Sequence, residues 1–185
     1  YAVKFDEVSF TYLRSNEKIF NKASFEISKG THTIITGPNG SGKSTLLGLI
    51  SGLYIPTNGN IKIASKKLGY VGVTPLIIEG TIKENLTYGN QEEVSDEKII
   101  EFLKRFKFKD REVDLYEVVS NKSLSSGQMQ KLSFIRVLLN KIDILLLDES
   151  TSNLDKESKI LIFNLLKDEK ITVINSTHNM DDFLY

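Results

Sequence analysis

The sequence predicts an α/β fold with a largely parallel central sheet and a helical insert between about residues 80 and 140. Short β-rich runs fill the first third of the chain, where polar turns separate them. Residues 142–147 are apolar except for Asp143, and the unbroken part, 144–147, is typical of a parallel strand buried on both faces. Helical periodicity precedes and follows this run, and strands that alternate with helices indicate a parallel sheet.

Five short strands are predicted from the β-rich runs, at residues 3–8, 25–27, 31–36, 61–63 and 68–73. One helix lies among them, and we expect it to begin near Lys43 and to end at Gly52. Ser95 is the predicted N-cap of the next helix, with Asp96 and Glu97 in its first turn.

Two further helices are predicted in the second half of the chain. A helix over residues 126–140 places Leu132, Ile135 and Leu139 on one face. A helix over residues 156–167 connects the apolar strand 142–147 to a strand at 171–175, which completes a β-α-β unit. His32, in an early strand, has no motif around it and is expected to be structural.

The composition is that of an ordinary globular domain. The 185 residues include 24 basic and 24 acidic side chains, and this neutral balance argues against general affinity for nucleic-acid backbones. The absence of cysteine excludes disulfides, thiol catalysis and thiolate metal sites. The longest apolar run, 144–147, is too short to span a membrane, and no signal peptide opens the chain. Because residue 1 is Tyr, we expect the true start to lie upstream.

A glycine-rich motif after the third predicted strand carries the strongest chemical signal. It matches G-x-x-x-x-G-K-[ST] without a mismatch, over Gly37, Pro38, Asn39, Gly40, Ser41, Gly42, Lys43 and Ser44, called the phosphate cradle below. Glycines let the backbone curl so that several N–H groups point at phosphate oxygens. We expect Lys43 to reach the β- and γ-phosphates and Ser44 to offer its hydroxyl to Mg²⁺. Thr45 belongs to the same expected site, at the positive end of the following helix.

Two carboxylates, Asp148 and Glu149, follow the apolar run directly. A buried strand that ends in adjacent acids is costly unless a cation lies there. Mg²⁺ held by the cradle is the expected partner of Asp148, and Glu149 is placed to orient and deprotonate an attacking water. The alternative is that both acids only cap the following turn.

A third element stands where the helix over 126–140 is predicted to start, and it consists of Leu124, Ser125, Ser126, Gly127 and Gln128. Ser125 and the N–H groups of Gly127 and Gln128 make a potential anion site. With this pentapeptide the chain resembles the ATP-binding cassette (ABC) ATPases, over nearly its whole length. The pentapeptide is similar to the family signature L-S-G-G-Q, with Ser126 in place of one glycine. Gln130 and Arg136 on the following helix also fit.

The resemblance implies a P-loop NTPase fold with a mostly parallel core sheet, an N-terminal antiparallel β subdomain and a helical insert that carries the signature. It implies ATP and Mg²⁺ as ligands, catalytic roles for Lys43, Glu149 and His178, and metal ligation by Ser44 and Asp148. Tyr12 is similar to the aromatic residue that stacks on adenine, and His178 to the histidine that contacts the γ-phosphate. The segment similar to the family's dimer interface is Ser152, Asn153, Leu154 and Asp155.

Residues 79–86 are similar to the S-G-T-I-x-E-N stretch of cassettes from ABC exporters, which borders the transmembrane domain. About 80 residues separate Lys43 from Leu124, too few for the coiled-coil insertion of chromosome-organising and DNA-repair relatives. The resemblance thus implies an exporter ATPase at the cytoplasmic face of a membrane, whose partners are a second cassette, identical or different, and a transmembrane domain, with no nucleic acid. It also implies that residues 1–185 are one nucleotide-binding domain, truncated at its C-terminal end and cut from a longer transporter chain.

Two departures from the family pattern leave alternatives open. Val73 stands where a glutamine usually contacts Mg²⁺ or the attacking water, and the exporter pattern V-G-E-x-G is absent from residues 117–123. We expect slow but real ATP hydrolysis. A nucleotide-gated switch with little turnover, in an asymmetric pair, is the first alternative, because of Val73 and Ser126. A soluble cassette that acts on ribosomes or nucleic acid is the second, and the exporter-like stretch around Thr81 counts against it.

Overall fold

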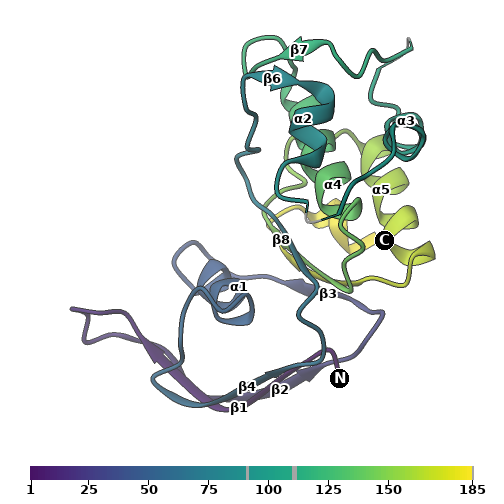
Figure 1. Ribbon diagram of the computed structural model, residues 1–185. Coiled ribbons are helices and arrows are strands. Elements are labelled where there is room, and N and C mark those ends of the chain that lie inside the picture. Colours follow the sequence, from purple (N-terminus) through teal and green to yellow (C-terminus); the bar gives the residue numbers. More distant parts are fainter. Residues whose placement is uncertain (91, 110–111, 185) are drawn as a thin grey trace.

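The fold was analysed in a computed structural model that describes residues 1–90, 92–109 and 112–184. The α-helices are α1 (Lys43–Ile50), α2 (Ile82–Thr87), α3 (Asp96–Arg105), α4 (Ser126–Leu138) and α5 (Lys156–Asp168) (Figure 1). The strands are β1 (Val3–Thr11), β2 (Lys18–Ile27), β3 (His32–Ile35), β4 (Asn58–Ile63), β5 (Leu68–Val71), β6 (Gly80–Thr81), β7 (Val118–Val119), β8 (Ile144–Asp148) and β9 (Thr172–Ser176). A short 3₁₀ helix, Met180–Leu184, follows β9.

The core sheet is parallel, as the sequence predicts. Its strand order is β3-β9-β8-β5, and each neighbouring pair runs in the same direction. Every residue of β8 and β9 is buried, which explains the unbroken apolar run that precedes Asp148. Because the strands are parallel, the loops that follow β3, β5, β8 and β9 all leave from one edge of the sheet.

The antiparallel sheet has the order β2-β1-β4 and contains a β-bulge. The register of β1 shifts between Phe5 and Val8, and the intervening Glu7 adopts a left-handed φ of 51°. This extra residue lets Phe5 and Val8 both face the core although they are three positions apart. The bulge packs against Gly59 of β4, where a Cβ would collide with the Glu7 carbonyl oxygen.

One expectation about this sheet is corrected. The run predicted at 25–27 is only the end of the longer strand β2, because Ala23, Phe20 and Lys18 before it also pair with β1. The expected N-terminal antiparallel sheet is confirmed, and its third strand comes from beyond α1. Strand β4 follows α1 in sequence but returns to pair with β1.

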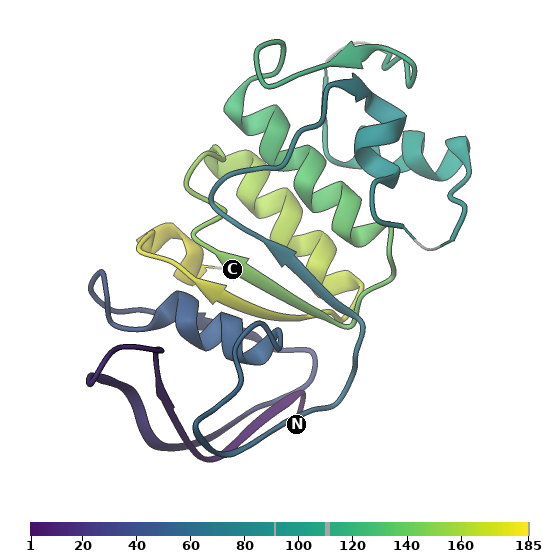
Figure 2. The same cartoon turned by 60° about the vertical axis from the view of Figure 1, so that its left-hand side comes forward.

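Helix α1 lies between the two sheets (Figure 2). Its Leu47, Leu49 and Ile50 share one apolar cluster with β1 and with Ile144 and Leu146 of β8. The alternate residues of β8, Leu145 and Leu147, belong to a second cluster formed with α2, α3, α4 and α5. The period-two alternation of a strand therefore joins both halves of the molecule through β8.

Helix α2 and the small ladder β6–β7 were not predicted from the sequence. Thr81 is the N-cap of α2, and it forms a capping box with Glu84, in which each side chain bonds the other residue's backbone N–H. Asn85 is fully buried, and its amide donates to the carbonyl oxygens of Ile78 and Thr81 and accepts from the Ile78 N–H. These bonds give a structural reason for the T-I-x-E-N pattern.

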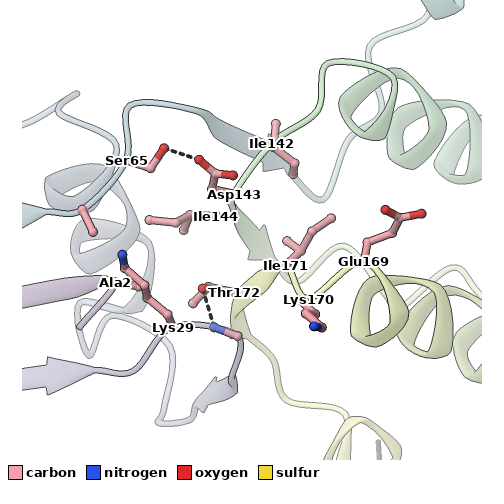
Figure 3. Close-up of a pocket in the computed structure, with 12 residues that line it drawn as sticks. Ala2, Lys29, Ser65, Ile142, Asp143, Ile144, Glu169, Lys170, Ile171 and Thr172 are labelled. Carbon is pink, nitrogen blue, oxygen red and sulfur yellow. Dashed lines mark hydrogen bonds between the residues drawn. The ribbon is translucent and has the colours of Figure 1, made fainter.

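A cavity of about 330 Å³ lies at the amino ends of β8 and β9, opposite the phosphate cradle (Figure 3). Asp143 and Thr172 line it, and they accept hydrogen bonds from Ser65 and from the Gly30 N–H, respectively. None of the residues singled out in the sequence as a functional site lines this cavity. In the ranges described above, no helix combines the length and apolarity that crossing a membrane requires.

Replacing Asn85 by alanine is expected to destabilise the protein by about 2 kcal/mol, since it leaves buried backbone groups of Ile78 and Thr81 unpaired. Denaturant unfolding of the purified protein measures this change. Asn164→Ala, at an exposed position of α5, is the control and should leave stability within about 0.5 kcal/mol of wild type. Equal stability of the two variants would contradict the role given to Asn85.

Candidate active site

The phosphate cradle connects the end of β3 to the start of α1. Gly40 and Gly42 adopt left-handed φ angles of 81° and 93°, which other residues adopt only at a cost. A Cβ added at Gly42 would also lie 2.7 Å from Cγ2 of Ile19. The glycines of the motif are therefore required by the backbone path, and the loop presents its N–H groups where α1 begins.

Lys43 is folded back into the cradle. Its ammonium donates to the carbonyl oxygens of Gly37 at 2.9 Å and Pro38 at 3.2 Å, and the residue is only 7% exposed. Two neutral carbonyl groups satisfy two of its three hydrogens but do not neutralise its charge. A buried cation at the mouth of a glycine loop is a suitable partner for a phosphate group.

Asp148 lies beside the cradle at the carboxyl end of β8. Its Oδ1 accepts from Ser44 Oγ at 3.1 Å, and its Oδ2 accepts from the Tyr70 hydroxyl at 3.0 Å. Partial burial and, next, the negative charge of Asp148 raise the pKa of Tyr70 to about 12. The Tyr70 hydroxyl therefore remains protonated at neutral pH and acts as the donor.

The residues around Asp148 fit a magnesium ion. The hydroxyl of Ser44 and the carboxylate of Asp148, which is 9% exposed, are adjacent oxygen donors of the kind that Mg²⁺ prefers. Among the described residues, no group of three His, Cys, Asp or Glu side chains gathers as a metal cage. Mg²⁺ ordinarily keeps water and substrate oxygens and takes only one or two protein carboxylates, so this donor set is sufficient.

Glu149 has a backbone conformation that few residues of its type adopt. Its φ is 51°, and its N–H donates to the Ser176 carbonyl oxygen of β9 at 2.8 Å. The turn directs the carboxylate toward the cradle, where Oε1 lies 4.0 Å from Lys43 Nζ and 2.9 Å from His178 Nε2. Such strain is stable only when the surrounding structure holds it, and it clusters at functional sites.

His178 connects the loop after β9 to the cradle. Its Nε2 lies 3.1 Å from Asn39 Oδ1 as well as 2.9 Å from Glu149 Oε1. Because a carboxylate oxygen only accepts, Nε2 carries the hydrogen in this arrangement. The structure therefore brings together Asn39, Lys43, Glu149 and His178 from three separate loops.

Tyr12 lies at the opening of the site. Its hydroxyl is 2.6 Å from Thr45 Oγ1 on the first turn of α1, and its ring packs edge-to-face against Tyr54. This contact places an exposed part of the ring next to the cradle. Stacking of Tyr12 on adenine stays a prediction.

The signature residues lie elsewhere in the chain. They begin α4, which packs on the opposite face of the core sheet from α1 (Figures 1 and 2). Ser125 caps α4 through a box with Gln128, so the Gln128 N–H, expected to be free for an anion, here donates to Ser125 Oγ. A Cβ at Gly127 would lie 3.5 Å from the Asn153 carbonyl oxygen, so the signature adjoins the expected interface segment.

Tyr70 is the residue of this site that sequence reasoning missed. It lies in the strand predicted at residues 68–73, which was identified from its β-rich pattern alone. The signal that could have found it is positional. A polar side chain near the carboxyl end of a strand that neighbours β8 is expected close to Asp148 in a parallel sheet.

Comparison with known proteins agrees with this geometry. A profile of the ABC transporter family matches residues 20–152, from β2 to the turn after Glu149. The structure of a bacterial Atm1-family ABC exporter with ATP bound superposes on this chain with a TM-score of 0.85 at 28% identity. The match covers 96% of this chain and 34% of that chain.

Two curated relatives indicate the branch of the family. ABC transporter B family member 22 of Arabidopsis thaliana is 36% identical over 89% of this chain, and the chain spans 15% of its length. The mitochondrial ATP-dependent permease MDL2 of Saccharomyces cerevisiae is 33% identical over 97% of this chain, which spans 26% of its length. The chain belongs to the ABC transporter family, as an ATP-binding cassette of the exporter type.

Proposed function

We propose that this chain binds Mg-ATP in the phosphate cradle and hydrolyses it, and that the hydrolysis drives export through a transmembrane partner. One observation carries the proposal. A phosphate-binding lysine, a metal-ligating pair and a candidate general base meet at one edge of the core sheet, with Lys43 Nζ 4.0 Å from Glu149 Oε1. A phosphate-binding loop beside a metal-ligating pair and a residue that orients the attacking water is the arrangement used for phosphoryl transfer to water.

Binding of the nucleotide changes the partners of Lys43. Its ammonium exchanges the carbonyl oxygens of Gly37 and Pro38 for β- and γ-phosphate oxygens, which are charged and therefore stronger acceptors. The N–H groups of the cradle and the first turn of α1 bind the remaining phosphate oxygens. Tyr12, held beside Thr45, is placed to contact the base.

Hydrolysis then needs a group that takes a proton from water. Ser44 and Asp148 would hold Mg²⁺, whose chemistry there is neutralisation of phosphate charge. Glu149 accepts a proton at its carboxylate as the water oxygen attacks the γ-phosphorus and the bond to ADP breaks. His178 donates to Glu149 Oε1 and orients this carboxylate. Its contact with Asn39 places it beside the cradle, where it can contact the terminal phosphate.

A second cassette completes the site in this proposal. The signature residues Ser125 and Gly127 lie across the core sheet from the cradle of their own chain, so they are suited to an ATP bound by another molecule. Gly127 adjoins Asn153, which supports a shared interface formed by the signature and the segment 152–155. Two cassettes arranged head to tail would then enclose two nucleotides.

Export through a transmembrane domain at the cytoplasmic face of a membrane is supported by the named relatives and by the surface near α2. Leu76 and Tyr88, which precede and follow α2 in the sequence, are large apolar side chains that remain exposed. We propose that this surface contacts the transmembrane domain.

A nucleotide-gated switch with little turnover is the second candidate. Val73 favours it, because this side chain is 48% exposed after β5 and has no atom that can bind a metal or orient water. In this alternative the cassette closes on ATP and opens on release, and the partner cassette performs the hydrolysis.

Glu149→Gln distinguishes the two candidates. If the cassette is a hydrolysing motor, Glu149→Gln is expected to lower the rate of phosphate release at least about 100-fold, because an amide cannot accept the proton. ATP binding should be retained. Phosphate release and ATP binding by the purified protein with Mg²⁺ are the two measurements. Glu157→Gln, on the exposed side of α5, is the control and should keep wild-type turnover. Undiminished turnover in Glu149→Gln would rule out Glu149 as the base.

Val73→Gln is expected to raise the turnover number about tenfold, a barrier change of about 1.4 kcal/mol, since it adds a polar group beside the site. The turnover number at saturating Mg-ATP is the measurement. Ile55→Gln makes a similar change at another exposed position and should have no effect. If the two glutamine variants behave alike, Val73 does not limit hydrolysis.

A further inference from the structure

Both oxygens of the Asp148 carboxylate are held by hydroxyl groups from different parts of the chain. Ser44 Oγ on α1 donates to Oδ1 at 3.1 Å, and Tyr70 on β5 donates to Oδ2 at 3.0 Å. Asp148 is 9% exposed, whereas Tyr70 is 50% exposed. Only the hydroxyl end of Tyr70 is thus committed to the site, and much of its ring faces solvent.

The register of the core sheet explains how Tyr70 reaches Asp148. Tyr70 lies opposite Leu146, and Asp148 is two residues further along β8 on the same face. Two residues along a strand advance about 6.6 Å, which is close to the length of a tyrosine side chain. Gly72 makes room for the ring, because a Cβ at this position would lie 3.3 Å from Tyr70 Cε1.

A side chain of α4 holds the backbone that follows β5. Gln130, which is fully buried, donates from Nε2 to the Gly72 carbonyl oxygen at 3.3 Å. The next side chain, Val73, points an apolar group into solvent. Among the described residues from β5 to Val73, it is thus Tyr70 that donates a hydrogen bond to Asp148.

We propose that Tyr70 is a positioning residue for the metal ligand Asp148, and so sets how strongly Mg²⁺ supports nucleotide binding. Its hydroxyl holds Oδ2, which keeps Oδ1 beside Ser44 Oγ as the oxygen available to the metal. Phenylalanine at this position would leave Oδ2 without its donor and free the carboxylate to rotate. The inference rests on the proposed function, because it needs a site that binds Mg-nucleotide.

The test compares Tyr70→Phe with Tyr116→Phe in the purified protein. Tyr116 is exposed, and its hydroxyl lies 3.5 Å from the carboxylate of Asp96, so this control also removes a tyrosine–aspartate contact, away from the site. The affinity for trinitrophenyl-ATP is measured by fluorescence, once with Mg²⁺ and once with EDTA. Paramagnetic resonance of Mn²⁺ added with ATP reports metal binding without turnover.

We expect Tyr70→Phe to weaken trinitrophenyl-ATP binding about tenfold with Mg²⁺, as loss of a hydrogen bond to a charged group implies, and to leave the affinity in EDTA unchanged. The bound Mn²⁺ signal should fall by a similar factor. Tyr116→Phe should match wild type in all three measurements.

Two results would overturn the inference while the proposed function stands. One is wild-type affinity of Tyr70→Phe under both conditions. The other is an equal loss with Mg²⁺ and with EDTA, which would mean that Tyr70 only supports the fold. If wild type itself binds no trinitrophenyl-ATP, the proposed function fails and this inference fails with it.

Discussion

The site depends on the parallel pairing of β3, β9, β8 and β5. Parallel strands place their carboxyl ends at one edge, so four loops that are distant in sequence meet there. The phosphate cradle follows β3, Tyr70 is next to the last residue of β5, Glu149 follows β8, and His178 follows β9. The hydrogen bond between Ser44 and Asp148 joins residues that are 104 positions apart. Without this pairing, the contacts that Asp148, Glu149 and His178 make with the cradle could not form.

The cradle also depends on packing behind it. Helix α1 buries Leu47 and Ile50 between the antiparallel sheet and one face of β8, which fixes the direction in which its first turn points. On the other face of β8, Leu145 and Leu147 pack against the helices that include α4. A single buried strand therefore links the phosphate-binding turn to the signature helix. In the proposed pair of cassettes, closure on a nucleotide would act on a rigid element, because packed cores do not deform continuously.

The parts of the fold that could be predicted from the sequence are those governed by local chemistry. The cradle can be predicted because its backbone path needs glycines, and the start of α3 can be predicted because Ser95 caps it. Asp155 caps α5 in the structure, a role that was not predicted for it. Helix α2 was missed because it is short, although Thr81 and Glu84 form a recognisable capping box. Tyr70 was not predicted as a partner of Asp148, since that contact depends on the pairing of β5 with β8, which no sequence pattern assigned, and on the small size of Gly72. The left-handed turn at Glu149 likewise comes from tertiary contact, with Ser176.

The most direct test of the account is an experimental structure of the Glu149→Gln protein with ATP and Mg²⁺. We expect Lys43 Nζ to leave the carbonyl oxygens of Gly37 and Pro38, where it now lies at 2.9 and 3.2 Å, and to bind phosphate oxygens. The metal should lie against Ser44 and Asp148, with Tyr70 still bonded to that carboxylate. A nucleotide bound elsewhere, or a Lys43 that keeps both carbonyl contacts while ATP is present, would contradict the account.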